Sequence, residues 1–273
     1  MEKINHILFP FYRFENLSAC RGILHFVSTA AGNIGYPDGE PSDRMLVARR
    51  RLAVAVGFRP EALCLGQQVH SDHIVEVKRQ DAGRGAMDRE SRFPETDALV
   101  TKETGVCLMV LAADCVPILL CDPVKKVVAA VHAGWKGTLA GIVEKTATVM
   151  QDRFNCCAAD IRAGIGPSIG KCCFEVGPEV AVLFQQKWKS FPGILGPVNS
   201  LGKCHIDLWE INRRQLLAVG IREEYIEVAG LCTKCHSEEF FSYRRSGNDA
   251  GRFGAGIMSV SYTHLTLPTK LEV

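Results

Sequence analysis

The chain has 273 residues, 47% of them hydrophobic, and its 32 basic and 30 acidic residues leave a formal net charge of +2. The apolar content is sufficient for a sizeable core and argues against a disordered chain. The nearly balanced charge argues against a protein that coats nucleic acid, because such proteins carry a strongly basic face.

The two ends of the chain differ in character. The first residues, MEKINHILFPFYRFEN, lack the long apolar run and the small-residue cleavage site of a secretory signal. The longest apolar run, residues 106–113, is too short to span a membrane and is broken at Asp114. We therefore expect a soluble, cytoplasmic protein that binds neither nucleic acid nor membrane.

Residues 261–273, SYTHLTLPTKLEV, resemble read-through of cloning sequence, so we expect one domain over 1–260 and a non-native tail over 261–273.

The first part of the chain predicts strands around one helix. Residues 22–30 are strand-like, and a Gly-rich loop with Asn33 follows. Ser42 or Asp43 can cap a helix that ends at Gly57. Residues 62–69 and 73–77 then indicate two strands on either side of a turn that contains His70.

The centre of the chain is the most strongly patterned part. Residues 105–113, 116–122 and 127–133 are almost continuously apolar, which is typical of strands buried on both faces. A Gly-rich turn, AGWKG, and a helix with one apolar stripe follow; the stripe consists of Leu139, Ile142, Val143, Thr146 and Met150.

The remaining segments complete an α/β pattern. Residues 161–170 indicate a strand and loop, and Pro178 suits the first turn of a helix. Asp207 and Glu210 form a capping-box pattern before a helix that ends at Gly220. Two late strands lie within 225–230 and 253–260. Strands and helices without a strict βαβ rhythm predict a single α/β domain with mixed β-sheets flanked by helices.

Three residues at the edges of patterned strands are candidate metal ligands. His70 lies in the turn of QQVHSDH, Cys115 follows the break at Asp114, and His132 ends the next apolar run. Imidazole and thiolate are ligands that zinc favours, and three protein ligands leave a fourth position open for water or substrate. Each residue taken alone is more often part of a core, and their wide spacing in the sequence does not single them out.

Several motifs resemble those of a known family. In chain order they are QQVHSDH, AADCVPILLCDP, VHAGWKGTLAGI, IGPSIGKCCFEVG and CTKCHSEEFFSYRRSGNDAGR. They resemble the signatures of the YfiH-like (laccase-domain) family, described as polyphenol oxidases and as purine nucleoside phosphorylases. The resemblance implies the YfiH-like fold and a zinc site formed by His70, Cys115 and His132. It further implies phosphorolysis of adenosine, inosine, guanosine and methylthioadenosine, with adenosine deamination as a companion activity.

Residues around this site are candidates for binding the nucleoside and phosphate. The turn before the helix can attract an anion, and Lys136 can add charge there. Arg244 and Arg245 are candidates because guanidinium groups hold oxyanions in a bidentate fork. Arg49 matches an arginine of the family, although Ala48 stands where the family has asparagine, and Asn33 keeps its place in an altered loop. Asp114 is a candidate for orienting a ligand or for proton transfer.

Three alternatives to this function remain open. Cys115 and His132 could be the nucleophile and base of a cysteine hydrolase or amidase, consistent with the peptidoglycan-editing role proposed for members of the family. A copper oxidase of phenolics would need many histidines, often as H-x-H pairs, whereas this chain has eight and no such pair. A purely structural zinc would need a fourth ligand such as Cys121 or His73.

The other cysteine motifs are interpreted without a function. Residues 232–236, CTKCH, match the haem-attachment pattern, but that chemistry requires export. A C-x-x-C pair can also be half a zinc site, and no second half is evident in the sequence. The vicinal pairs Cys156-Cys157 and Cys172-Cys173 are interpreted as small apolar residues.

Overall fold

Two six-stranded sheets form the body of the protein. The computed structural model describes residues 1–36 and 43–261. The first sheet has the order β1 (Glu2–Ile4), β2 (Phe11–Arg13), β3 (Ile23–Ser28), β14 (Phe253–Ser259), β7 (Cys107–Ala112) and β4 (Leu63–Leu65). The second has the order β13 (Ile226–Val228), β10 (Arg162–Ile165), β8 (Val116–Asp122), β9 (Val127–Ala133), β6 (Ala98–Thr101) and β5 (Ile74–Glu76). Both sheets are mixed, because β4 pairs with β7, β10 with β13 and β5 with β6 in parallel, while their other pairs are antiparallel.

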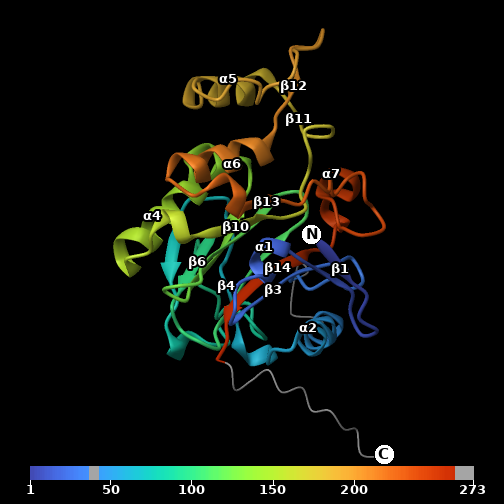
Figure 1. Cartoon of the computed structure of the whole chain (residues 1–273). Helices are drawn as coiled ribbons and strands as arrows, with labels where there is room; N and C mark the ends of the chain where they lie inside the picture. Colours follow the sequence, from blue (N-terminus) through green and yellow to red (C-terminus); the bar gives the residue numbers. More distant parts are fainter. Residues whose placement is uncertain (37–42, 262–273) are drawn as a thin grey trace, which may run out of the picture.

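Helices cover the outer faces of this sandwich. Helix α2 (Asp43–Val56) packs against the first sheet through Leu52 and Ala53, in a core that also contains Phe26. Helices α3 (Trp135–Ala140), α4 (Ile142–Phe154) and α6 (Leu208–Ala218) belong to the core on the other side, with the second sheet. Figure 1 shows α2 and the pair α4 and α6 on opposite sides of the strands.

The apolar runs in the centre of the sequence are buried on both faces, as predicted. In β8, Leu119 and Cys121 belong to the core between the two sheets. Ile118 and Leu120, which alternate with them, belong to the core under α4 and α6. Every residue of β8 and β9 is buried. The predicted fold class, an α/β domain with mixed sheets and flanking helices, is therefore confirmed.

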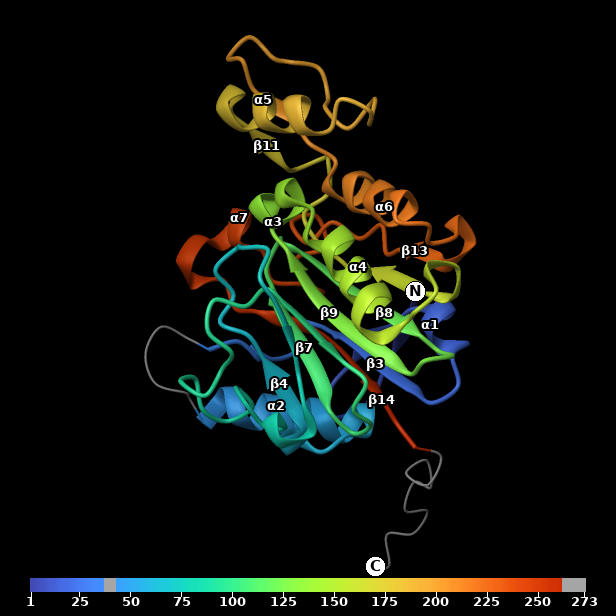
Figure 2. The same ribbon diagram turned by 90° about the vertical axis from the view of Figure 1, so that its left-hand side faces the viewer.

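Some elements differ from the sequence prediction. The single helix expected after the AGWKG turn is two helices, because Gly141 has φ +82° and ends α3 before α4 begins. Helix α5 (Pro178–Lys187) begins at the expected proline, and Phe184 is its only buried residue. With the short strands β11 (Glu175–Val176) and β12 (Cys204–His205), α5 projects away from the sheets (Figure 2). Two further short helices are α1 (Glu15–Ser18) and α7 (Tyr243–Ser246).

The helix termini follow from local sequence. The Asp207 side chain caps α6 by accepting a hydrogen bond from the Glu210 N–H. Helix α2 ends before Gly57, whose φ of +94° suits glycine. The alternative cap Ser42 and the expected tail, apart from Ser261, lie outside the described residues. No helix in the described ranges is long and apolar enough to cross a bilayer.

Candidate metal centre and substrate pocket

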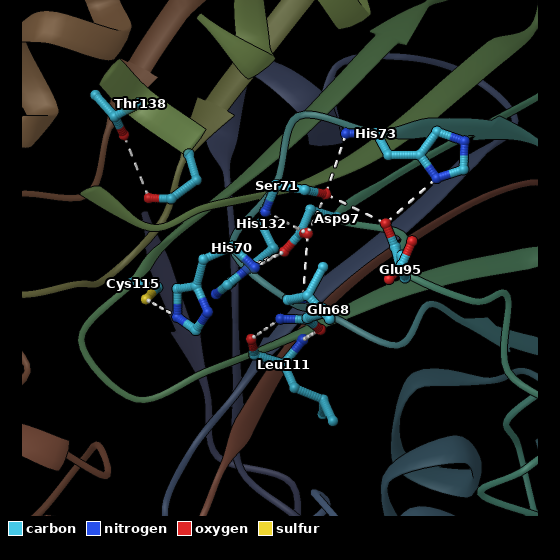
Figure 3. Close-up of polar contacts among 12 residues, drawn as sticks. Gln68, His70, Ser71, His73, Glu95, Asp97, Leu111, Cys115, His132 and Thr138 are labelled. Atoms are coloured by element: carbon cyan, nitrogen blue, oxygen red, sulfur yellow. Dashed lines mark hydrogen bonds and ion pairs between the residues drawn. The ribbon is translucent and has the colours of Figure 1, made fainter. Parts of the chain in front are cut away.

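His70, Cys115 and His132 come together at one end of the sandwich. His70 lies in the loop after β4, Cys115 in the connection from β7 to β8, and His132 within β9. Their ligand atoms all lie within 4.8 Å of one another, with 3.6 Å between Cys115 Sγ and His70 Nε2. Figure 3 shows the His70 ring and the Cys115 thiol facing one another. The residues predicted as metal ligands thus form one compact cluster.

The donor set of this cluster suits a transition metal. Two imidazoles and a thiolate are ligands that zinc and copper accept, and three protein ligands are typical of zinc sites with an open position. The two residues considered as a fourth ligand lie elsewhere: the Cys121 thiol is 3.5 Å from Cys20 Sγ, and His73 contacts the Glu95 carbonyl. Neither belongs to the cluster, so the structure does not favour a four-ligand structural metal there.

Two of the candidate ligands, His70 and Cys115, lie at or next to residues with unusual backbone conformations. His70 has φ +64° and Asp114, which precedes Cys115, has φ +92°. Positive φ is uncommon for residues other than glycine and is maintained only where surrounding contacts fix it. The Asp114 carboxylate supplies such contacts, because it accepts hydrogen bonds from the Thr233 hydroxyl and the Arg244 N–H, both at 2.6 Å. This placement favours a positioning role for Asp114 over proton transfer.

Asp97 is a buried residue that organises the centre and that no pattern in the sequence marks. It directly precedes β6, where Ala98 pairs with Val131, so it lies opposite His132 and its carbonyl accepts the His132 N–H at 2.8 Å. Its Oδ1 contacts His132 Nδ1 at 2.7 Å and accepts the His70 N–H at 3.0 Å. Its Oδ2 accepts the N–H groups of Val69 and Ser71 and the Ser71 hydroxyl. One carboxylate therefore orients His132, leaving its Nε2 for a metal, and holds the His70 loop.

We expect Asp97→Asn to lower metal affinity and activity by about 10–100-fold, the usual cost of losing a residue that orients a metal ligand. Asparagine cannot accept all five hydrogen bonds that the carboxylate accepts. Competition with a chelator would measure the affinity. Asp72→Asn is the control, because Asp72 lies in the same loop but pairs with Lys145 at the surface. Equal affinity in Asp97→Asn and wild type would contradict the orienting role.

The charges within the metal-free centre reinforce one another. Burial raises the pKa of the Cys115 thiol, but interactions with His132 and His70 outweigh it and lower the pKa to about 6. Burial lowers the pKa of His132, but the Cys115 thiolate and the Asp97 carboxylate raise it to about 9. At neutral pH the metal-free protein thus holds a thiolate, an imidazolium and a carboxylate in contact. Because metal binding needs a thiolate and neutral imidazole, the ion would displace a proton from His132.

A pocket of about 640 Å³ opens onto this cluster, a volume typical of sites for small molecules. All three candidate ligands line it. Four arginines line it as well: Arg89, Arg92, Arg244 and Arg252. Aromatic side chains complete the wall: Tyr36, Trp135, Phe174 and Tyr243. Guanidinium groups and aromatic rings beside a candidate metal site suit a ligand that has both an anionic group and a flat ring.

Of the predicted substrate-binding residues, Arg244 is the one that lines the pocket. Its guanidinium donates to the carbonyls of Cys173 and Glu175. Arg245, its neighbour, donates instead to the carbonyls of Thr233 and Phe240. Arg245 is absent from the pocket lining, so direct substrate contact by Arg245 stays a prediction that this placement does not favour.

The other three predicted residues support the pocket from outside its lining. Arg49 is fully buried; its guanidinium donates to the carbonyls of Ile34, Gly85 and Ala86 and stacks 4.5 Å from the Tyr36 ring. Asn33 Oδ1 accepts the Arg252 N–H at 2.8 Å. Lys136 is exposed, with its ammonium 5.7 Å from the Trp135 ring. Each therefore contacts a residue of the pocket wall rather than the pocket itself.

Arg89, Arg92 and Arg252 were missed because sequence periodicity does not mark loop residues. Arg252 does have a signal, since it ends the CTKC…DAGR segment, one of the motifs that carry the family resemblance. Arg89 and Arg92 lie in an irregular loop and stand beside the pocket only through the fold, with Arg92 5.1 Å from the Tyr36 ring.

Comparisons with known proteins agree with this architecture. The family model described as multi-copper polyphenol oxidoreductase laccase matches residues 25–260. A purine nucleoside phosphorylase of Bacteroides thetaiotaomicron is 37% identical over 255 residues, covering 90% of this chain and 94% of the relative. An adenosine deaminase, RL5, from an unknown prokaryotic organism is 36% identical over 219 residues, covering 80% and 83%. The crystal structure of YlmD from Geobacillus stearothermophilus superposes with a TM-score of 0.86 at 31% identity, covering 96% of this chain and 98% of YlmD.

Proposed function

Because the chain belongs to the YfiH-like (laccase-domain) family, we propose that it is a zinc-dependent purine nucleoside phosphorylase with a companion adenosine deaminase activity. The observation that carries the proposal is the pocket in which His70, Cys115 and His132 lie beside four arginines. Relatives named purine nucleoside phosphorylase and adenosine deaminase support the same two reactions. The expected substrates are adenosine, inosine, guanosine and methylthioadenosine.

Both reactions need the groups that this pocket contains. In phosphorolysis a phosphate oxygen forms a bond to ribose C1′ while the bond from C1′ to the purine nitrogen breaks, and the base leaves with a proton. In deamination water adds at purine C6 and ammonia leaves. A zinc ion at His70, Cys115 and His132 would supply a Lewis acid at the open position. The arginines bind the phosphate, and the aromatic side chains hold the purine by stacking.

Product analysis tests the proposal directly. The purified protein, without residues 261–273, is incubated with each of the four nucleosides, with and without phosphate. We expect release of free base that depends on phosphate, and conversion of adenosine to inosine without phosphate. If no nucleoside is consumed by zinc-loaded protein, the proposed function is wrong.

Arg244→Lys should raise the KM for phosphate by about 10–100-fold, because a lysine loses the bidentate fork and one charged hydrogen bond is worth about 1.5–3 kcal/mol. Initial rates at varied phosphate concentration measure this effect. Arg245→Lys is the matched control: it changes the adjacent residue in α7, which lies outside the pocket lining. An unchanged KM for phosphate in Arg244→Lys would show that the phosphate does not contact Arg244.

A cysteine amidase is the second candidate, and one observation favours it. The Asp97 carboxylate contacts the His132 ring, and His132 interacts with the Cys115 thiol, as the acid, base and nucleophile of a catalytic triad do. The same interactions lower the pKa of the thiol to about 6. In metal-free protein, labelling of Cys115 by iodoacetamide should therefore persist at neutral pH and be lost as the pH falls through about 6. The extent of labelling is measured by mass spectrometry of the labelled peptides between about pH 4 and about pH 10. This range of about six pH units includes the ordinary pKa of a thiol. An ordinary rise near the usual thiol pKa would contradict the activated thiolate.

Amide hydrolysis separates the two candidates. The amidase needs the thiolate free, so metal removal would increase its activity, whereas nucleoside cleavage would stop. A copper oxidase of phenolics ranks below both candidates. A single centre of two histidines and one cysteine accepts copper as well as zinc, but the two clusters of metal-binding side chains in the described ranges contain only two histidines between them, too few for a trinuclear copper site in addition.

A further inference from the structure

Four cysteines form a second cluster outside the His70–Cys115–His132 centre. Cys172 and Cys173 lie in the loop after β10, and Cys232 and Cys235 in the loop after β13. All four Sγ atoms lie within 4.8 Å of one another. The vicinal pair thus lies against the C-x-x-C motif, for which no second half is evident in the sequence, and its two cysteines are exposed and half-buried. All four thiols are free of disulfide bonds.

The spacing of the thiols suits a single tetrahedral ion. Four sulfurs at about 2.3 Å from a zinc ion lie about 3.8 Å apart. The Cys235 Sγ is 3.8 Å from Cys172 Sγ and 3.5 Å from Cys173 Sγ. A disulfide would instead need the sulfurs at about 2.05 Å. Four thiolates also leave no open position, which is typical of structural and not catalytic zinc.

The backbone around the cluster is arranged as in a built metal site. The Gly170 N–H donates to Cys232 Sγ at 3.3 Å, a contact of the kind that orients metal ligands. A Cβ at Gly170 would lie 3.0 Å from the Trp209 ring and 3.3 Å from Cys172 Sγ, so glycine leaves room for the thiols. In the opposing loop, the N–H groups of Cys235 and His236 both donate to the Cys232 carbonyl and fold C-x-x-C into a tight turn.

We propose that Cys172, Cys173, Cys232 and Cys235 bind a structural zinc ion that joins the loop after β10 to the loop after β13. Both loops contact residues that surround the His70–Cys115–His132 centre and its pocket. Ile169 donates its N–H to the Asp114 carbonyl, and Thr233 donates its hydroxyl to the Asp114 carboxylate. The Cys173 carbonyl accepts a hydrogen bond from Arg244. The ion therefore fixes the turn that presents Cys115 and the arginine that lines the pocket.

Metal counting on the full chain tests this site independently of activity. The protein is purified under reducing conditions, loaded with zinc, desalted and measured by elemental mass spectrometry. We expect two zinc ions per chain in wild type. Cys115→Ala should keep one, and the double variant Cys172→Ser with Cys235→Ser should keep the other. Cys157→Ser, which changes an exposed cysteine outside both clusters, should keep two.

Cobalt gives a second readout on a variant in which the four cysteines are intact. Cys115→Ala loaded with Co²⁺ should show the intense thiolate-to-cobalt charge transfer and the strong visible bands of a tetrahedral tetrathiolate site. Absence of metal from Cys115→Ala would overturn the proposal, even if the double variant fails to fold. A disulfide between the two loops in wild type, found by alkylation and peptide mapping, would overturn it as well. Loss of nucleoside cleavage alone leaves these metal counts unchanged, so the two proposals fail separately.

Discussion

Cys115→Ala should lose the metal ion of the His70–Cys115–His132 centre and reduce kcat/KM for phosphate-dependent cleavage of adenosine by at least about 10³-fold. This loss should exceed the reduction of about 10–100-fold that is typical when a residue that merely orients a metal ligand is replaced. The variant removes the only anionic ligand of the cluster and leaves His70 and His132, whose ring centroids are 5.0 Å apart. Its small side chain creates no clash, so the fold should persist.

The measurement pairs metal content with steady-state rates on the same sample. Cys157→Ala controls for loss of a thiol in general, because Cys157 is exposed and belongs to neither cluster. A Cys115→Ala protein that keeps its full metal content and its rate would refute the assignment of the centre. A protein that keeps the metal but loses all activity would show that the Cys115 thiol acts in the reaction other than as a metal ligand.

Gly134→Ala should disturb the same centre by adding a single methyl group. A Cβ at Gly134 would lie 2.6 Å from Cδ2 of His70 and 3.2 Å from Cys115 Sγ, both well inside van der Waals contact. The backbone itself accepts alanine, since φ is −63° and ψ is 172°. Displacing the His70 ring by even about 1 Å can reduce the rate of a precisely positioned site by about 10²-fold. We expect weaker metal binding and a loss of at least that size.

Gly196→Ala is the matched control for this substitution. The nearest atoms to a Cβ at Gly196 belong to His205 and lie at 3.5–3.7 Å, an ordinary contact distance. Metal affinity and kcat/KM are measured for both variants. Wild-type values in Gly134→Ala would show that His70 does not hold the metal in the position described. Equal losses in the two variants would show that the effect is a general cost of replacing glycine.

The cluster of His70, Cys115 and His132 could be predicted because its residues lie at the edges of patterned strands. His132 closes a buried run and Cys115 follows the break at Asp114, so the sequence marks both positions. Family motifs then grouped them with His70. Asp97 carries no such mark, because an acidic residue before a strand is ordinary in any sequence, and only the register of β6 with β9 places it opposite His132.

The cysteine cluster and the arginines show what a linear pattern leaves out. Cys172-Cys173 and the C-x-x-C pair are about sixty residues apart along the chain, as the separation of 63 between Cys172 and Cys235 shows. Their association depends on the parallel pairing of β10 with β13, which brings the loops after both strands to one edge. Arg92 similarly reaches the pocket from an irregular loop. Contacts that depend on strand pairing over long separations have no local signature in the sequence.

The connection from β7 to β8 leaves one sheet and enters the other, and Cys115 lies within it. His70 follows a strand of the first sheet, and His132 belongs to the second. An ion bound by all three would link the two sheets, and its binding free energy would stabilise the folded protein. At a free metal concentration of 100 times Kd, this linkage is worth about 2.7 kcal/mol. Heat resistance of the protein would then report how fully the centre is loaded.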